Sequence, residues 1–415
     1  MSANFVDIDI VLNDFCNEME TGLSEGGSSL AMIASYIKAD ACIPVNKPVI
    51  VLDAGGTNLR VCTVSFNEHG TVDIECFEQY QMPGVSHELS KQSFYNAICD
   101  YLEPVINKSD SIGFCFSYPT EMAESKDGKL LYWTKEVKVP ELVGEYIGSG
   151  LLAELAKRGH TGKKLVLLND TVSTLLAGRA IGKQWQCDSY IGFILGTGTN
   201  TAYIEKNSNI PKVSASSGTQ VINVESGNFS KYPQGDIDKL FDDSTTNPGA
   251  YTFEKMISGR YLGSVALCLL KKAAVNGLFS KAATAEIKSL RCLTTPELSI
   301  FFENSFGLFT PFNSEKITPN DRKTLYYFIL ELIERAAKLT AVNIAAAVIK
   351  SNSGRSPLHP ICINIDGSMF YELFGFNEKC EEYLAATLNS RGFYFKTIRV
   401  ENAPIIGAAF AGLAS

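Results

Sequence analysis

Short apolar runs that end in glycine-rich or polar turns recur along the first half of the chain. Runs rich in Val and Ile at about 48–53, 60–66 and 72–78 predict three successive strands. A polar stretch with helical spacing follows over about 89–106, and residues 112–117 form another short apolar run. The first unit is therefore predicted to be three strands, a helix and a fourth strand.

A helix near 140–158, a buried strand at 164–168 and a helix at 171–182 are predicted next. The same order then begins again, with strands predicted at 189–195, 200–205 and 220–224. Two units that each begin with strand, glycine turn, strand and strand indicate two similar halves. No repeat of 20–50 residues is present, which argues against a solenoid.

The remaining segments are predicted to be mainly helical. Apolar positions at helical spacing over 9–40 predict two helices, and helices dominate from about 253 to 350, with a long alanine-rich one at 319–350. A last buried strand is predicted at 362–365. A helix, a strand near 394–400 and a short apolar helix over 404–413 close the predicted order.

Composition fits an ordinary globular protein. The chain has 415 residues, 45% hydrophobic residues and a net charge of −8, so nucleic acid and anionic membranes are poor default partners. No segment reaches the roughly 18 continuous apolar residues of a membrane helix, and the start does not resemble a secretory signal. Eleven cysteines without a C-x-x-C pair predict reduced, buried thiols, no zinc site and a cytoplasmic location.

The first strand pair is joined by a turn suited to phosphate. Gly55 and Gly56 let a ligand approach the backbone N–H groups, and neighbouring side chains add a carboxylate, two polar groups and a cation. These are Asp53, Thr57, Asn58 and Arg60. The design fits a triphosphate with its magnesium, with Asp53 facing a metal-bound water. The alternative is a hairpin turn chosen only for its glycines.

Two later turns follow the same logic. The second turn joins two predicted strands and consists of Gly196, Thr197, Gly198 and Thr199. Its glycines leave backbone N–H groups accessible, and its threonines add hydroxyl donors. Gly367 and Ser368 follow Asp366 at the end of another buried strand, where a turn with a helix cap is an equal alternative. Two turns of this kind suggest two lobes that hold one nucleotide between them.

The pair Asn169 and Asp170 lies between a buried strand and a helix. Asp170 can serve simply as the helix cap. However, open α/β sheets bind ligands at the carboxyl ends of their strands, and a helix N-terminus keeps a carboxylate ionised. Because the four histidines lie outside the motifs, a carboxylate such as Asp170 is the candidate general base for an alcohol.

Other polar side chains also follow apolar runs. Ser117 ends its strand, Thr134 and Lys135 supply a hydroxyl and an amine, and Lys135 can neutralise a moving phosphoryl group. Glu225 follows the strand at 220–224, and Glu254 begins a helix. Each of these has an ordinary structural alternative, such as a solvated loop or a first-turn carboxylate that favours the helix dipole.

The combination resembles the hexokinase family of sugar kinases. The motifs are Leu-Asp-Ala-Gly-Gly-Thr-Asn-Leu-Arg, Phe-Ser-Tyr-Pro, Trp-Thr-Lys, Asn-Asp-Thr-Val, Gly-Thr-Gly-Thr-Asn, Asn-Val-Glu-Ser-Gly, Phe-Glu-Lys-Met-Ile-Ser-Gly-Arg-Tyr-Leu-Gly and Asp-Gly-Ser, spread over about 49–410. The resemblance implies an α/β, two-lobed actin-like ATPase fold, related to ribonuclease H, with a central cleft. It also implies ATP-dependent phosphorylation of the 6-hydroxyl of glucose or a related hexose, such as mannose or fructose, with magnesium.

The resemblance also implies domains and residue roles. The small lobe is expected at 47–170, with a helix at 403–415 returning to it, the large lobe at 171–402, and N-terminal helices at 1–46 packing on the large lobe. Asp170 corresponds to the general base of the family. The positions that contact the sugar correspond to Ser117, Thr134, Lys135, Asn169, Asn200, Glu225 and Glu254. The first phosphate motif corresponds to Asp53, Gly55, Gly56, Thr57, Asn58 and Arg60. The second corresponds to Gly196, Thr197, Gly198 and Thr199. The positions near the adenosine correspond to Gly367 and Ser368.

Some positions depart from the animal and yeast pattern. Met122, Glu136 and Ser226 replace the usual residues beside the motifs, and the segment after Ser368 lacks His-Pro. These departures suggest a divergent, bacterial-type member and bear on sugar preference. Two other functions stay open: a sugar sensor that does not catalyse, and an actin-like ATPase. Oligomeric state is not indicated by the sequence.

Overall fold

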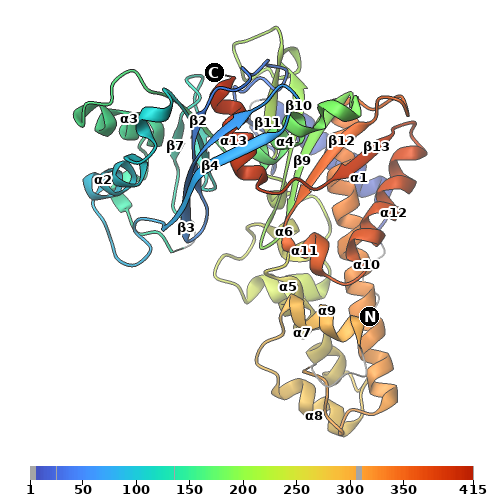
Figure 1. Ribbon diagram of the computed structural model, residues 1–415. Coiled ribbons are helices and arrows are strands. Elements are labelled where there is room, and N and C mark those ends of the chain that lie inside the picture. Colours follow the sequence, from blue (N-terminus) through green and yellow to red (C-terminus); the bar gives the residue numbers. More distant parts are fainter. Residues whose placement is uncertain (1–5, 25, 135, 305–310, 415) are drawn as a thin grey trace.

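The protein has two lobes, each built on its own β-sheet (Figure 1). The computed structural model describes residues 6–24, 26–134, 136–304 and 311–414. A five-stranded sheet forms the small lobe and a six-stranded sheet forms the large lobe. The large lobe extends into a helical tip at the bottom of the view.

The small-lobe sheet is mixed, with the strand order β4-β3-β2-β5-β8. Its strands are β2 (Val49–Ala54), β3 (Asn58–Phe66), β4 (Val72–Gln81), β5 (Ser111–Phe116) and β8 (Lys164–Leu168). Strands β2, β5 and β8 are parallel, so their carboxyl ends lie at one edge of the sheet. A short hairpin of β6 (Thr120–Met122) and β7 (Gly128–Leu130) follows β5.

Both faces of β2 are covered, which explains its continuous apolar sequence. Ile50 and Leu52 pack in a core with α2 (Lys91–Leu102) and α3 (Ile147–Lys157). Val49 and Val51 point to the other face and pack in a core that includes α13 (Ala403–Leu413). Alternate residues of a strand face opposite sides, so a strand buried on both sides reads as unbroken hydrophobic sequence.

The large-lobe sheet has the order β1-β11-β10-β9-β12-β13. Its strands are β1 (Ile33–Ala34), β9 (Ser189–Leu195), β10 (Thr199–Lys206), β11 (Thr219–Asn223), β12 (Ile361–Asp366) and β13 (Phe395–Ile398). Strands β9, β12 and β13 are parallel, and β10 is antiparallel to both β9 and β11. The glycine turn between β9 and β10 and the end of β12 therefore lie at the same edge.

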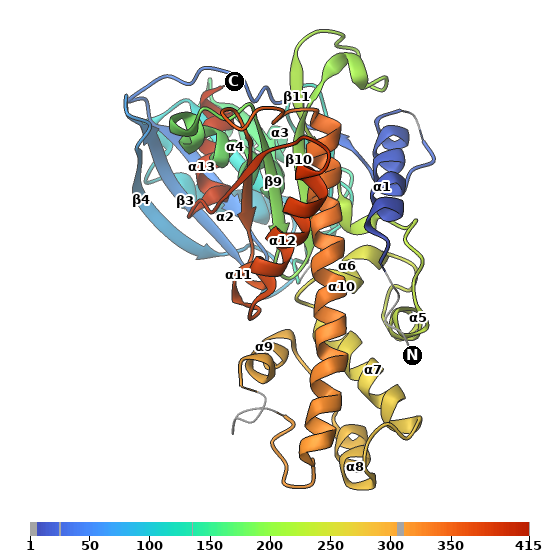
Figure 2. The same ribbon diagram turned by 90° about the vertical axis from the view of Figure 1, so that its right-hand side faces the viewer.

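A long helix, α10 (Pro319–Ser351), connects this sheet to the tip (Figure 2). It begins at a capping box in which Thr318 and Asp321 satisfy each other's backbone N–H groups, with Pro319 in the first turn. The other helices of the large lobe are α5 (Asp236–Asp243), α6 (Thr252–Ile257), α7 (Leu262–Val275), α8 (Lys281–Ser289), α9 (Thr295–Glu303), α11 (Ser368–Glu372) and α12 (Phe376–Asn389). The long helix and the helical region before it confirm the sequence prediction.

Two helices, α4 (Asp170–Ile181) and α13, lie between the sheets and join the lobes. A Cβ on Gly113 of β5 would lie 1.9 Å from the carbonyl oxygen of Ala408, and one on Gly407 would lie 1.9 Å from that of Ser173. A Cβ on Gly192 of β9 would lie 2.4 Å from the carbonyl oxygen of Thr171. The layers are thus small sheet, α13, α4 and large sheet, in direct backbone contact.

The N-terminal segment contains one helix, so the prediction of two helices over 9–40 is wrong. Helix α1 (Ile8–Leu23) is followed by extended chain that places β1 beside β11. Leu30, Met32 and Ala34 are buried at every second position, which is strand spacing. Met32 also has a φ of 46°, which is incompatible with a right-handed helix.

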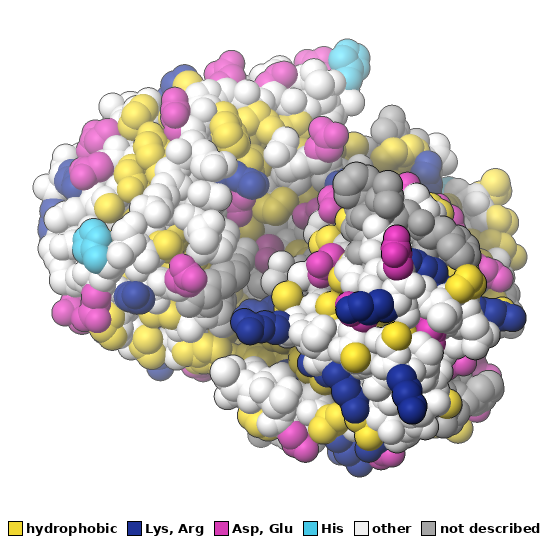
Figure 3. Space-filling model, turned by 90° about the horizontal axis from the view of Figure 1, so that it is seen from below, with side chains coloured by type: hydrophobic (Ala, Val, Ile, Leu, Met, Phe, Trp, Pro, Cys, Tyr) yellow, Lys and Arg dark blue, Asp and Glu magenta, His cyan; other side chains and the backbone are white. Residues whose placement is uncertain are grey.

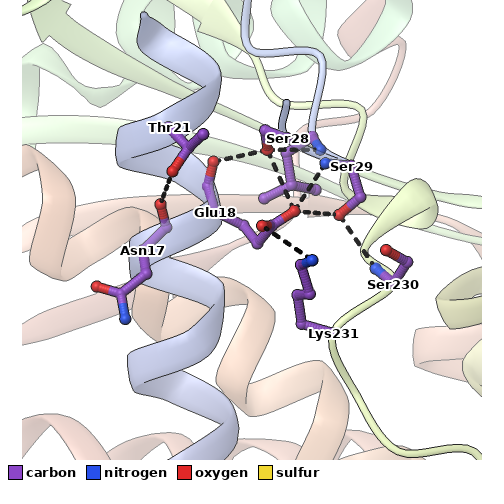
Figure 4. A network of polar contacts seen from close by, with 8 residues as sticks. Asn17, Glu18, Thr21, Ser28, Ser29, Ser230 and Lys231 are labelled. Atoms are coloured by element: carbon purple, nitrogen blue, oxygen red, sulfur yellow. Dashed lines mark hydrogen bonds and ion pairs between the residues drawn. The ribbon is translucent and has the colours of Figure 1, made fainter. Parts of the chain in front are cut away.

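A buried carboxylate fastens this segment to the large lobe (Figure 4). Glu18 of α1 is 7% exposed, and its Oε2 accepts hydrogen bonds from the backbone nitrogen and the hydroxyl of Ser29, at 2.7 and 2.6 Å. Ser29 Oγ in turn accepts from the backbone nitrogen of Ser230, and Lys231 lies 4.0 Å from Glu18. The network therefore ties α1 to the segment that follows β11.

Two further sequence expectations concern membranes and thiols. Within the described ranges, none of the helices combines the length and apolar character needed to cross a bilayer. All eleven cysteines are free. Five are buried, but Cys42, Cys76 and Cys292 are exposed, so the expectation that the cysteines are core residues is wrong for these three.

Candidate active site

The predicted site residues of the small lobe gather at the carboxyl edge of its sheet. Asp53 of β2 lies opposite Cys115 of β5, and Cys115 lies opposite Leu168 of β8. Just beyond this row come the first glycine turn, Ser117 and Asn169. Seen from below, a deep recess separates the small lobe from the rest of the molecule, with acidic side chains visible inside it (Figure 3).

The first glycine turn is a tight hairpin between β2 and β3. Gly55 donates its backbone N–H to the carbonyl oxygen of Asn58 at 3.0 Å, and the Tyr118 hydroxyl donates to the carbonyl oxygen of Gly55 at 2.7 Å. Asp53 and Arg60 are cross-strand partners and form an ion pair of 3.3 Å. The turn is therefore fixed from both sides. Gly56, Thr57 and Asn58 also lie in this turn, and Thr57 and Asn58 are exposed.

Asn169, and not Asp170, caps helix α4. The Asn169 side chain accepts a hydrogen bond from the backbone nitrogen of Thr171 at 2.8 Å, and the helix begins at Asp170. The Asp170 carboxylate accepts from the Thr171 hydroxyl at 3.2 Å and is partly exposed. The helix-capping role that was the alternative function of Asp170 is therefore performed by Asn169.

Two carboxylates of the small-lobe edge lie around one buried thiol. Burial raises the pKa of Cys115, and the negative charges of Asp53 and Asp170 raise it further. Cys115 also pairs in register with Asp53. The first phosphate turn and the candidate base are consequently neighbours in the folded protein.

Glu225 of the large lobe faces the same space. Asn223 donates to Glu225 Oε1 at 2.8 Å, and Asn200 donates to Asn223 Oδ1 at 2.7 Å. Burial raises the pKa of Glu225, and the charges of Asp170 and Glu254 add to this effect while the Asn223 hydrogen bond opposes it. Glu225 also has a φ of 57°, a backbone conformation that costs free energy and is typical of functional sites.

Glu254 of α6 reaches the second glycine turn. Its Oε2 accepts a hydrogen bond from the backbone nitrogen of Thr199 at 3.0 Å. A Cβ on Gly198 would lie 2.6 Å from the same oxygen, so the glycine makes room for the carboxylate. Burial raises the pKa of Glu254, opposed by the Thr199 hydrogen bond and the charge of Arg260.

The second and third turns border one groove of about 530 Å³. Gly196 N–H donates to the carbonyl oxygen of Gly198 at 2.9 Å, and Gly259 N–H donates to that of Gly196 at 2.8 Å. Gly367 has a φ of 117°, and a Cβ there would lie 2.3 Å from the carbonyl oxygen of Leu195. Gly196, Thr197, Arg260 and Ser368 line this groove. Such a glycine-lined channel at strand ends fits a nucleotide.

The remaining predicted residues lie near the first turn. Ser117 donates its backbone N–H to the carbonyl oxygen of Ala54 at 3.2 Å, and Thr134 is partly buried. Trp133 packs against Tyr118, with ring centroids 4.9 Å apart. Lys135, for which a catalytic role is predicted, lies outside the described residues.

Sequence reasoning missed two contributors. Asn223 joins Asn200 to Glu225, and its place at the end of an apolar strand was a usable signal. Tyr251 lies at the N-terminus of α6, and its hydroxyl is 2.7 Å from that of Tyr132 in the small lobe. No motif predicted that contact, because the two residues are 119 positions apart in the sequence.

Family models cover most of the chain. Two models, both described as hexokinase, match residues 4–180 and 190–414. The chain is 30% identical to Hexokinase-7 of Oryza sativa subsp. japonica, over 95% of this chain and 90% of the rice protein. It is 32% identical to Hexokinase-1 of Spinacia oleracea, over 89% of this chain and 80% of that protein.

Solved structures show the same fold. A hexokinase from Schistosoma mansoni complexed with glucose matches with a TM-score of 0.77 and 24% identity, over 99% of this chain and 96% of that chain. A second hexokinase crystal structure matches with a TM-score of 0.78 and 22% identity, over 98% and 94%. The expected two-lobed fold of the actin-like ATPase class is thus confirmed.

The relatives correct one expectation. Those named above come from plants, and the structure in complex with glucose comes from an animal, so a bacterial-type member is not supported. The departures at Met122, Glu136 and Ser226 therefore do not indicate a bacterial type. With both family models matched and about nine-tenths of the chain aligned to plant relatives, the protein belongs to the hexokinase family.

Proposed function

We propose that the protein transfers the terminal phosphoryl group of ATP to the 6-hydroxyl of glucose or a related hexose, with Asp170 as the general base. Membership of the hexokinase family supports the reaction class. The observation that supports the residue assignment is the position of Asp170. Its charge acts on Cys115 beside the first phosphate turn and on Glu225 in the opposite lobe.

Asp170 would accept the proton of the attacking hydroxyl. Asn169 takes over the capping of α4, so the Asp170 carboxylate keeps acceptor capacity for a substrate. It lies in the first turn of α4, at the helix N-terminus, where open α/β sheets bind their ligands. A base within hydrogen-bond reach of the alcohol is the main chemical requirement, because most of the rate in phosphoryl transfer comes from positioning and electrostatics.

The polar groups around Asp170 would hold the hexose. Glu225 and Glu254 offer carboxylate acceptors from the large lobe, and Asn200 orients Glu225 through Asn223. The small lobe would contribute Ser117, Thr134, Lys135 and Asn169. A sugar that lacks one hydroxyl would leave one of these groups unpaired, which is the physical basis of selectivity.

The glycine turns fit a nucleotide on both sides of the recess. Gly196, Gly259 and Gly367 form a cradle that a Cβ would fill. Bound ATP with its magnesium would supply the phosphoryl group. From the small lobe, the phosphates would be surrounded by Asp53, Gly55, Gly56, Thr57, Asn58 and Arg60. From the large lobe, Gly198 and Thr199 would add hydrogen-bond donors. Ser368 would lie near the adenosine. A cytoplasmic location and the lobe boundaries at 47–170 and 171–402 stay predictions.

The test is ATP turnover measured with and without hexose. We expect ADP release and sugar phosphate formation that both depend on glucose, mannose or fructose. Binding of glucose without sugar phosphate would indicate a sensor. ATP hydrolysis that hexose does not change would indicate an actin-like ATPase.

A further inference from the structure

Two tyrosines from opposite lobes meet beside the predicted hexose site. The hydroxyl oxygens of Tyr132 and Tyr251 are 2.7 Å apart, a hydrogen-bond distance in which either can donate. Tyr132 comes two residues before Thr134, on the loop after β7. Tyr251 comes three residues before Glu254, at the N-terminus of α6. The contact therefore connects one predicted sugar-binding segment of each lobe.

Tyr251 is held firmly in the large lobe. Its carbonyl oxygen accepts the first hydrogen bond of α6, from the backbone nitrogen of Lys255 at 2.9 Å. Lys255 is itself buried, and its Nζ donates to Asp242 at 2.5 Å and to the carbonyl oxygen of Asn247 at 2.8 Å. Tyr251 has a φ of 54°, which a bulky residue keeps only where its surroundings fix it.

The residues on either side of Tyr132 are anchored in the small lobe. The residue before it, Leu131, donates its backbone N–H to the carbonyl oxygen of Pro119 at 3.0 Å. The residue after it, Trp133, donates its indole N–H to the carbonyl oxygen of Val139 at 2.7 Å. A hydrogen bond between two fixed loops costs little ordering entropy, so it can set the distance between them.

The Tyr251 phenol also faces the predicted sugar carboxylates. Burial raises its pKa, and the hydrogen bond to Tyr132 and the charges of Glu225 and Glu254 raise it further. These interactions agree with the position of Tyr251 at the N-terminus of α6, three residues before Glu254. The tyrosine pair thus lies beside the predicted hexose residues, and neither tyrosine lines the groove that contains Gly196 and Ser368.

We propose that Tyr132 and Tyr251 are positioning residues of the hexose site, whose shared hydrogen bond fixes the Thr134 loop against the helix that bears Glu254. The inference rests on the proposed hexose kinase function. Loss of either hydroxyl leaves both loops anchored but no longer joined. Hexose binding must then bring the two loops together without that contact, so its affinity falls while the chemical step is preserved.

The test uses the full chain with Tyr132→Phe, Tyr251→Phe and the double variant, because Phe keeps the ring and its packing. We expect each single variant to raise the KM and the Kd for glucose about three- to tenfold, the effect of one hydrogen bond. The kcat and the KM for ATP should stay within about twofold. The double variant should match the singles, because the two hydroxyls form one interaction.

A matched control and an optical readout are available. Tyr146 is exposed to a similar extent as Tyr132, 44% against 47%, and its hydroxyl has no hydrogen-bond partner among the described residues, so Tyr146→Phe is the control. The chain has two tryptophans, so a Trp185→Phe background leaves Trp133, next to Tyr132, as the fluorescent reporter of glucose binding. Tyr146→Phe should leave that titration unchanged.

The outcomes separate the two claims. If the parent protein phosphorylates glucose and both tyrosine variants bind it as tightly as the parent, the positioning role is wrong. Additive losses in the double variant would also overturn it, because the hydroxyls would then act separately. A parent protein without glucose-dependent turnover would instead refute the proposed function on which the inference depends.

Discussion

The Glu254 carboxylate and the Thr199 backbone nitrogen are 3.0 Å apart, so a predicted sugar-binding side chain holds the second phosphate turn. The relation is reinforced by Gly198, whose missing side chain leaves room for that carboxylate. The predicted sugar and nucleotide sites are therefore in direct contact. A change at Glu254 is transmitted to Thr199 through a direct contact.

We accordingly predict that Glu254→Gln raises the KM for both substrates. The amide would be a weaker acceptor for a hexose hydroxyl and for the Thr199 N–H, and a charge-assisted hydrogen bond is about twice as strong as a neutral one. Initial rates with glucose and ATP varied separately would measure the two constants. Glu286→Gln, at the helical tip, is the control. An unchanged KM for ATP would contradict the coupling.

Replacing Asp170 should remove most of the catalysis. Asp170→Ala is expected to lower kcat at least about 100-fold, because the attacking hydroxyl loses its proton acceptor. Glucose binding, followed by intrinsic fluorescence, should persist, because Glu225, Glu254 and Asn169 remain. Asp188→Asn, at the far end of β9, provides a control carboxylate. A smaller fall in kcat would show that another group is the base.

The acid limb of the pH profile should reflect the raised pKa of Glu225. Burial and the charges of Asp170 and Glu254 raise the pKa of Glu225 above its ordinary value of 4.5. As the pH falls through this raised pKa, Glu225 takes up a proton and ceases to be a full acceptor, so kcat/KM falls. In Glu254→Gln one of the raising charges is absent. The limb should therefore move to lower pH, and a limb that stays in place would argue against Glu225.

The strand and helix order was largely predictable from the sequence, and the motifs predicted where the glycine turns of the candidate site lie. The continuous apolar run of β2 and the glycines after β2 and β9 are local signals, and they correctly predicted the strand and the turns. The second N-terminal helix was wrong because Ile33 and Ala34 pair with β11, about 190 residues away, which no local pattern reveals. Similarly, the sequence does not show whether Asn169 or Asp170 is the N-cap of α4. Both side chains can cap a helix, and the backbone geometry at the start of α4 decides between them.

The contact between β5 and α13 should be intolerant of added volume. A Cβ at Gly113 would lie 1.9 Å from the carbonyl oxygen of Ala408, which is backbone and cannot rotate away. Gly113→Ala is expected to lower the free energy of unfolding by about 1 to 3 kcal/mol or more, as overpacking does. Thermal denaturation would measure it. Ala156→Gly, on a helix remote from this contact, controls for a change of one methyl group.

The Glu18 network should contribute stability that depends on pH. Burial by itself would raise the pKa of Glu18, but hydrogen bonds from Ser29 and Ser28 and the charge of Lys231 lower it overall. The stabilisation is therefore complete above the ordinary value of 4.5 and is lost as the pH falls through the lower folded pKa. Glu18→Gln should cost about 1 to 3 kcal/mol at pH 7.

The difference between Glu18→Gln and the parent protein should shrink in acid. Chemical denaturation at pH 7 and at about pH 3.5 would measure it, with Asp14→Asn on the same helix as the control for a lost charge. An equal difference at both pH values would show that the ionised carboxylate is not what stabilises the network.

The place of α13 between the small sheet and α4 has a consequence for biosynthesis. The strands of the small lobe are translated early, but one face of β2 and β5 acquires its cover only when residues 403–413 arrive. Until then the nascent polypeptide carries an exposed apolar sheet, a surface prone to aggregation and recognised by chaperones. Ribosome stalling before this helix should therefore leave an amino-terminal half that is synthesised in full yet unable to complete its own core.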